Sequence, residues 1–147
     1  MYLTYEQYIQ YGGTLDESAF DMYEFEAASK IDYYTFNRLK KGAGFDEQSE
    51  DVKEAVYRCE YRLISLMRAR DTANAVSGEG SDESSTVVAG IASQSNDGVS
   101  ISYNVLSASE ASANTQAEID KTIKIYLSSC KNSLGQRLLY RGIYEDE

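Results

Sequence analysis

The stretch VKEAVYRCEYRLISLM, residues 52–67, carries the clearest apolar pattern of the chain. Its apolar side chains recur at intervals of three and four residues, and they are Val52, Val56, Cys59, Leu63, Leu66 and Met67. This spacing places them on one face of an α-helix. Ser49 is a suitable N-cap for that helix. We therefore predict a central core helix after Ser49, with Val56, Cys59 and Leu63 buried and Ile123 packed near them.

The residues before this helix predict two more helices. Thr4 and Gln7 form a capping-box pattern for a short helix over residues 5–11, and two glycines then end it. Thr14 with Glu17 repeats the pattern for a second helix. Its apolar stripe consists of Phe20, Tyr23, Ala27, Ile31 and Tyr34, and it fades near Asn37.

The residues after the central helix change character. SGEGSDESS, residues 77–85, is polar and acidic, and it predicts a mobile loop. Asp97-Gly98 is a hairpin-turn signal, and the apolar residues Val99, Ile101 and Tyr103 alternate with polar ones after it. A two-stranded hairpin is marginally stable alone, so this one needs another surface to cover it. Residues 76–107 thus read as a flexible loop followed by a hairpin insertion.

The last part of the chain predicts a fourth helix and a tail. Thr115 and Glu118 form its capping box, and Ile119, Ile123, Tyr126 and Leu127 form its apolar face. Residues 132–135 break the helix, and residues 136–147 read as a C-terminal tail. The tail is rich in apolar side chains, so it either folds back on its own core or docks on another surface. The fold class is mainly α: a single domain over residues 1–147, with about four helices, an inserted hairpin or extended arm and an extended tail.

Composition weighs against catalysis and against DNA or membranes as binding partners. The chain has 147 residues, a net charge of −10 and no His. The missing His removes the commonest general base and metal ligand. Acidic pairs such as Asp16 with Glu17 resemble helix caps more than metal ligands. The net negative charge disfavours binding to nucleic acid and to anionic lipid. No apolar run spans a bilayer and nothing resembles a signal peptide, so we expect a chain made in the cytoplasm without cofactor or metal.

Arginines on the central helix suggest a nucleic-acid patch as an alternative. They alternate with acidic residues, including Glu54 and Glu60, so a solvated or inter-subunit ion-pair face is the preferred interpretation. The thirteen Tyr favour surfaces that become buried on association, although some must fill the core.

The ordered set of these motifs resembles the head-tail connector, or adaptor, family of tailed bacteriophages. The stretches that carry the likeness are MYLTYEQYIQYGGTLDESAF (1–20), ASKIDYYTFNRL (28–39), VKEAVYRCEYRLISLM (52–67), GIASQSNDGVSISY (90–103) and LLYRGIY (138–144). The resemblance implies a virion neck protein and no enzyme. It implies a ring of about twelve copies under the portal, with cyclic symmetry. Such a ring joins the portal to head-closure or tail-terminator proteins and surrounds DNA only in transit.

Apolar segments without an obvious partner in the bundle supply the candidate interface. We expect the hairpin and the tail to make the main contacts outside the subunit, through Val99, Ile101, Tyr103, Leu138, Leu139, Tyr140, Arg141, Ile143 and Tyr144. The alternative function is a small acidic helical regulator or inhibitor that binds another protein. A metal-dependent enzyme is a third, less favoured reading.

Overall fold

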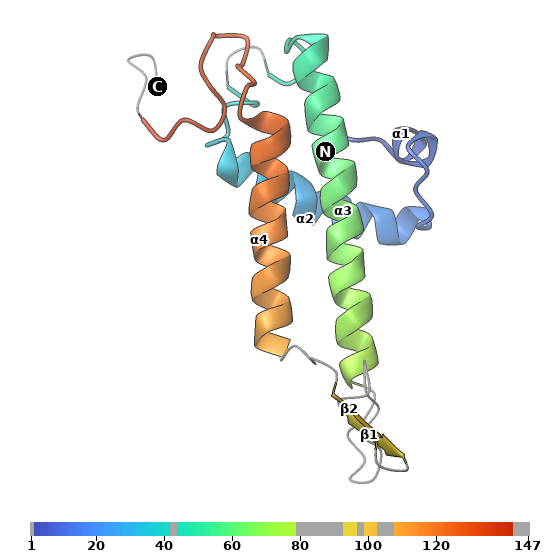
Figure 1. Ribbon diagram of the computed structural model, residues 1–147. Coiled ribbons are helices and arrows are strands. Elements are labelled where there is room, and N and C mark those ends of the chain that lie inside the picture. The colour runs from blue at the N-terminus through green and yellow to red at the C-terminus, as the bar shows by residue number, and fades with distance from the viewer. Residues whose placement is uncertain (1, 42–43, 79–92, 97–98, 103–107, 143–147) are drawn as a thin grey trace.

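The computed structural model of the chain describes residues 2–41, 44–78, 93–96, 99–102 and 108–142, and this part is mainly helical, as predicted. Its helices are α1 (Tyr5–Gln10), α2 (Glu17–Tyr34), α3 (Glu50–Gly78) and α4 (Ala108–Leu127). The long helices α3 and α4 lie side by side and antiparallel, and α2 crosses the pair (Figure 1). No helix in these ranges is both long enough and apolar enough to cross a membrane.

The central helix forms the core as predicted. Val56, Cys59, Leu63 and Ile123 are each 0% exposed and belong to one apolar cluster. The helix begins at Glu50, directly after Ser49, but continues to Gly78. The first two residues of the loop predicted over residues 77–85 are therefore helical, and residues 79–85 lie outside the described ranges.

The short helix α1 confirms its predicted start and its glycine stop, although it ends at Gln10, one residue before the predicted Tyr11. The Thr4 side chain accepts a hydrogen bond from the Gln7 backbone N–H, and the Gln7 side chain accepts one from the Thr4 N–H. At the other end, Gly12 has a φ of 90°. The N–H groups of Gly12 and Gly13 bond the carbonyls of Ile9 and Tyr8, which is a Schellman motif.

The starts of α2 and α4 differ from the prediction. Asp16, not Thr14, caps α2 by accepting from the Ala19 N–H at 2.9 Å. An aspartate is as good a cap as a threonine, and it shortens the helix by two residues. Helix α4 begins at Ala108, so the predicted cap Thr115 lies within it. The alanines and polar residues before Thr115 continue the helix without an apolar stripe.

Two short strands precede α4. Strand β1 (Ser93–Asn96) pairs antiparallel with β2 (Val99–Ser102), with Asn96 opposite Val99. The turn residues Asp97 and Gly98 lie outside the described residues. The predicted hairpin arm and its outward contacts therefore stay a prediction.

Buried carboxyl groups hold the N-terminal segment in the core. The Tyr2 N–H donates to Glu24 at 3.1 Å, and the Leu3 N–H donates to Glu60 at 2.7 Å. Glu60 is 0% exposed, so the sequence-based assignment of this residue to a solvated ion-pair face is wrong. That assignment holds for Glu54, which pairs with Arg58 on the surface at 2.6 Å.

A buried arginine ties down the start of the C-terminal tail. Arg38 is 1% exposed, and its guanidinium donates to the carbonyls of Arg137 (3.1 Å), Tyr140 and Gly142 (2.9 Å). The backbone of residues 137–142 is thus bonded to the chain segment that follows α2. Of the two alternatives for the tail, this part folds back on its own subunit.

Candidate functional site

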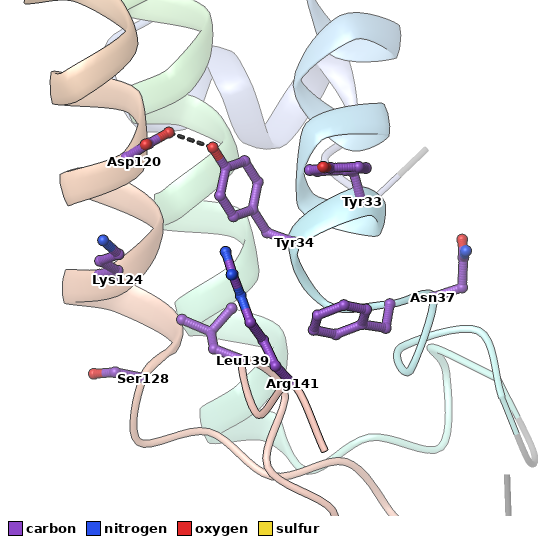
Figure 2. A pocket seen from close by; sticks show the side chains of 9 residues that line it. Tyr33, Tyr34, Asn37, Asp120, Lys124, Ser128, Leu139 and Arg141 are labelled. Carbon is purple, nitrogen blue, oxygen red and sulfur yellow. Dashed lines mark hydrogen bonds between the residues drawn. The ribbon is translucent and has the colours of Figure 1, made fainter. Parts of the chain in front are cut away.

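An open groove of about 990 Å³ lies where the end of α2, the last turns of α4 and the tail meet (Figure 2). We call it the docking groove. Its lining combines aromatic, aliphatic, polar and cationic side chains, namely Tyr33, Tyr34, Phe36, Asn37, Asp120, Lys124, Ser128, Leu139 and Arg141. A mixture of aromatic surface and a few charged groups suits recognition of another chain.

The aromatic wall of the groove follows from the way α2 ends. The N–H groups of Phe36 and Asn37 bond the carbonyls of Tyr33 and Asp32, which is again a Schellman motif. Here, however, Phe36 occupies the left-handed position with a φ of 55°, and Asn37 follows at 57°. A left-handed residue with a Cβ costs roughly 1–2 kcal/mol, and such strain gathers at functional sites. The Phe36 ring is half exposed, and the Arg38 guanidinium carbon lies 5.0 Å from its centre.

A hydrogen bond between α2 and α4 fixes the floor of the groove. The Tyr34 hydroxyl donates to the Asp120 carboxylate (Figure 2), and the Gln116 side chain donates to the same oxygen at 2.8 Å. The bond from Tyr34 lowers the pKa of Asp120, and the same bond raises the pKa of the Tyr34 hydroxyl. Both groups are therefore held in their ordinary charge states. They act as a brace between helices and supply no proton for chemistry.

The groove carries two cations, Lys124 and Arg141, and one carboxylate, Asp120. The charge of Lys124, one turn further along α4, helps to lower the pKa of Asp120. The lining therefore has a net positive charge in a chain with 24 acidic and 14 basic residues. In Figure 2 Lys124 projects from α4, and Arg141 lies beside Leu139 with its guanidinium end toward Tyr34. The arrangement favours a ligand that is both apolar and negatively charged.

A second apolar surface runs along the outer face of α2. Met22, Phe25 and Tyr33 are 62%, 74% and 77% exposed. Their spacing, with Ser29 between them, places them on one helical face, and Tyr33 joins that face to the groove. Sequence reasoning missed this stripe because the apolar residues from Phe20 to Tyr34 already accounted for the core. The signal that could have revealed it is a second set of apolar side chains at helical spacing on the same helix.

The predicted interface residues of the tail divide between core and groove. Leu138 is 0% exposed within the subunit, which corrects its assignment to contacts outside it. Leu139 and Arg141 line the groove, and Tyr140 is 53% exposed beside them. Their role at an interface stays a prediction.

The other predicted interface residues lie elsewhere in the chain. Val99 and Ile101 lie in β2. Tyr103, Ile143 and Tyr144 lie outside the described residues. Sequence reasoning did not single out Phe36 or Lys124, which the structure adds to the site.

The carboxylates and thiols of the described residues are further candidates for metal binding or reactivity. Across the described ranges, no three Cys, Asp or Glu side chains gather in a way that could hold a metal ion. Burial raises the pKa of the Cys59 thiol to about 12, so it stays protonated and unreactive at neutral pH. Cys130, half-buried, also has a raised pKa because of desolvation.

No family model, curated protein or solved structure matches the chain.

Proposed function

We propose that this chain is a structural protein of a bacteriophage neck, which forms a ring between the portal and the head-closure or tail-terminator proteins. The observation that carries the proposal is the continuous exposed surface formed by the outer face of α2 and the docking groove. It presents Met22, Phe25, Tyr33 and Phe36 to solvent, next to the cations Lys124 and Arg141. The sequence resemblance supplies the type of assembly.

Surface energetics support an assembly role. Burying one large apolar side chain contributes roughly 1.5–3 kcal/mol. Four such side chains exposed on one small subunit would promote aggregation unless a partner covers them. In a ring, each subunit contacts two neighbours through two different surfaces, and such contacts close when the rotation between subunits allows it. The groove and the α2 face supply at least one of these surfaces.

The overall acidity suits the proposed position in the virion. A net charge of −10 per subunit, repeated about twelve times around a channel, would repel DNA phosphates and let DNA pass without being held. The hairpin arm, through Val99, Ile101 and Tyr103, is proposed as a further contact with neighbouring subunits or with the portal. The location in the virion neck is part of the same proposal.

The test replaces Phe36 with asparagine in the phage or prophage that encodes the chain. Asn adopts the left-handed conformation readily, so Phe36→Asn removes the ring while the fold is kept. We expect helical circular dichroism like that of the natural chain, but filled heads that are not joined to tails in electron micrographs. Ser128→Ala, also in the groove but without loss of apolar surface, is the matched control and should assemble normally.

Imaging of intact particles decides between the neck role and the regulator. Density for this chain between portal and tail is expected. Particles that lack the chain, together with a stable complex between it and a single non-virion protein, would support an acidic regulator instead.

A further inference from the structure

The N-terminal segment, residues 2–4, lies outside the helices and strands and is anchored in the core by side chains. Its own side chains Tyr2 and Leu3 are buried in the apolar cluster. The Tyr2 N–H donates to Glu24 of α2, and the Leu3 N–H donates to Glu60 of α3. Two carboxyl groups from two different helices therefore attach the backbone of this segment to the bundle.

These two carboxyl groups share one buried site. Glu24 and Glu60 are 4% and 0% exposed, and they accept from successive backbone N–H groups. Oε1 of Glu60 is closed off from solvent and accepts no hydrogen bond from the described residues. A second negative charge in this site would have neither water nor a donor to stabilise it. One proton on the pair removes that charge and gives Oε1 a hydrogen to donate toward Glu24.

We propose that residues 2–4 act as a clasp, which is closed while the pair of Glu24 and Glu60 holds a proton and opens when that proton leaves. Opening lets water reach both carboxylates, so it relieves their repulsion and supplies the missing solvation. It also withdraws Leu3 from the core, so the loss of one proton exposes an apolar side chain and the site that it fills. The clasp belongs to the single subunit and does not depend on the neck role.

The groups that face Glu60 set the pH at which the clasp opens. Burial raises the pKa of Glu60 most, and Glu24 on α2 adds to the rise. The Leu3 N–H and the N-terminal ammonium of the chain oppose it but do not cancel it. The closed clasp is therefore fully stable at acidic pH, and it loses stability as the pH rises toward the raised pKa of Glu60.

The other titratable groups around this site add no net charge to it. Burial raises the pKa of the neighbouring Cys59 thiol to about 12, so the thiol stays neutral. Burial and a hydrogen bond to Asp32 raise the pKa of the Tyr2 hydroxyl. Asp32 in turn forms an ion pair with Lys40. The proton on Glu60 is therefore the one that controls the clasp.

Hydrogen exchange of the Leu3 amide in the full chain, followed by NMR from pH 5 to pH 8, tests the clasp. The protection factor, which corrects for the intrinsic exchange rate, should fall about tenfold per pH unit, because each opening releases one proton. In Glu60→Gln no proton can leave, so the protection factor should not change with pH. Glu47→Gln replaces an exposed carboxylate and should behave like the natural chain.

Urea separates opening of the clasp from unfolding of the whole chain. Opening of a short segment exposes little surface, so the protection of Leu3 should hardly change up to about 1 M urea. The core amides of Val56 and Leu63 in α3 exchange through global unfolding, and their protection should fall roughly fivefold or more over the same range.

Three results would overturn the proposal. The first is a Leu3 protection factor that does not change with pH in the natural chain, and the second is one that falls equally in Glu60→Gln. The third is a Leu3 amide that loses protection in urea as steeply as Val56, because the segment then leaves the core only when the whole chain unfolds. If Glu60→Gln fails to fold, the pH and urea series on the natural chain decide by themselves.

Discussion

Replacing Glu60 with glutamine should raise the free energy of unfolding relative to the natural protein, and this difference should grow as the pH rises above 4.5. Glu60 is fully buried, and burial raises the pKa of its carboxyl well above the ordinary 4.5, with the nearby Glu24 carboxylate adding to the effect. One oxygen accepts from the Leu3 N–H, and the other has no hydrogen-bond partner if the group is ionised. A proton on that oxygen can be donated to Glu24. Glutamine keeps both interactions, because its oxygen accepts and its amide donates.

The magnitude follows from proton linkage. Between pH 4.5 and the raised native pKa, the folded protein holds a proton on Glu60 that the unfolded chain has released. The contribution of Glu60 is therefore complete below pH 4.5 and is lost as the pH rises toward the native pKa. The free energy of unfolding falls by about 1.4 kcal/mol per pH unit in this window, or roughly 2.7 kcal/mol over two units. Glu60→Gln removes this slope.

The assay is urea unfolding followed by circular dichroism from pH 4.5 to pH 8. The two proteins should have similar stability near pH 4.5, where Glu60 is protonated in the folded state and half protonated in the unfolded chain, and diverge above it in favour of the variant. Glu47→Gln replaces an exposed carboxylate, and its free energy of unfolding should change with pH as that of the natural protein does. If the free energy of unfolding of Glu60→Gln also followed the natural curve, at lower values throughout, Glu60 would be ionised in the folded state and the argument would be wrong.

Three other variants test the core, the tail anchor and the groove floor. Leu63→Ala should lower the free energy of unfolding by roughly 2–5 kcal/mol in urea, since the side chain is fully buried; a loss under 1 kcal/mol would contradict its place in the core. Arg38→Lys keeps the charge but not the forked donors, so amide hydrogen exchange in residues 137–142 should accelerate while that of α3 does not. Tyr34→Phe should cost about 1 kcal/mol at neutral pH. Because the bond lowers the Asp120 pKa, this cost should shrink as the pH falls below 3.8 and Asp120 becomes protonated; a cost independent of pH would exclude the bond as its cause.

Local patterns in the sequence predicted the helices and the core. Thr4 with Gln7 defined α1, and the spacing of Val56, Cys59 and Leu63 identified the central helix. These predictions succeeded because capping and helical periodicity depend on residues a few positions apart. The helix starts were less certain, since Thr14 and Asp16 are both good caps and only the folded chain selects one.

Features that depend on distant residues were not predictable from local patterns. Glu60 lies in a helix rich in charges, and nothing near it in sequence indicates that its partners are Leu3 and Glu24. Leu138 is buried in a segment whose carbonyls, including that of Arg137, accept from Arg38, about a hundred positions earlier. The groove joins α2, α4 and the tail, so the sequence identified Leu139 and Arg141 as candidates for contacts but could not place them beside Phe36.

The bonds from Arg38 to residues 137–142 also constrain how the protein is made. During synthesis, α1, α2 and the Arg38 guanidinium leave the ribosome long before Gly142 is added. Until then the guanidinium has none of these three carbonyls as acceptors, and burying it without them would be costly. The helices can form in the nascent chain, but the final burial of Arg38 must wait until residues 137–142 have left the ribosome. We infer that the groove, which includes Leu139 and Arg141, is completed only after these residues have emerged.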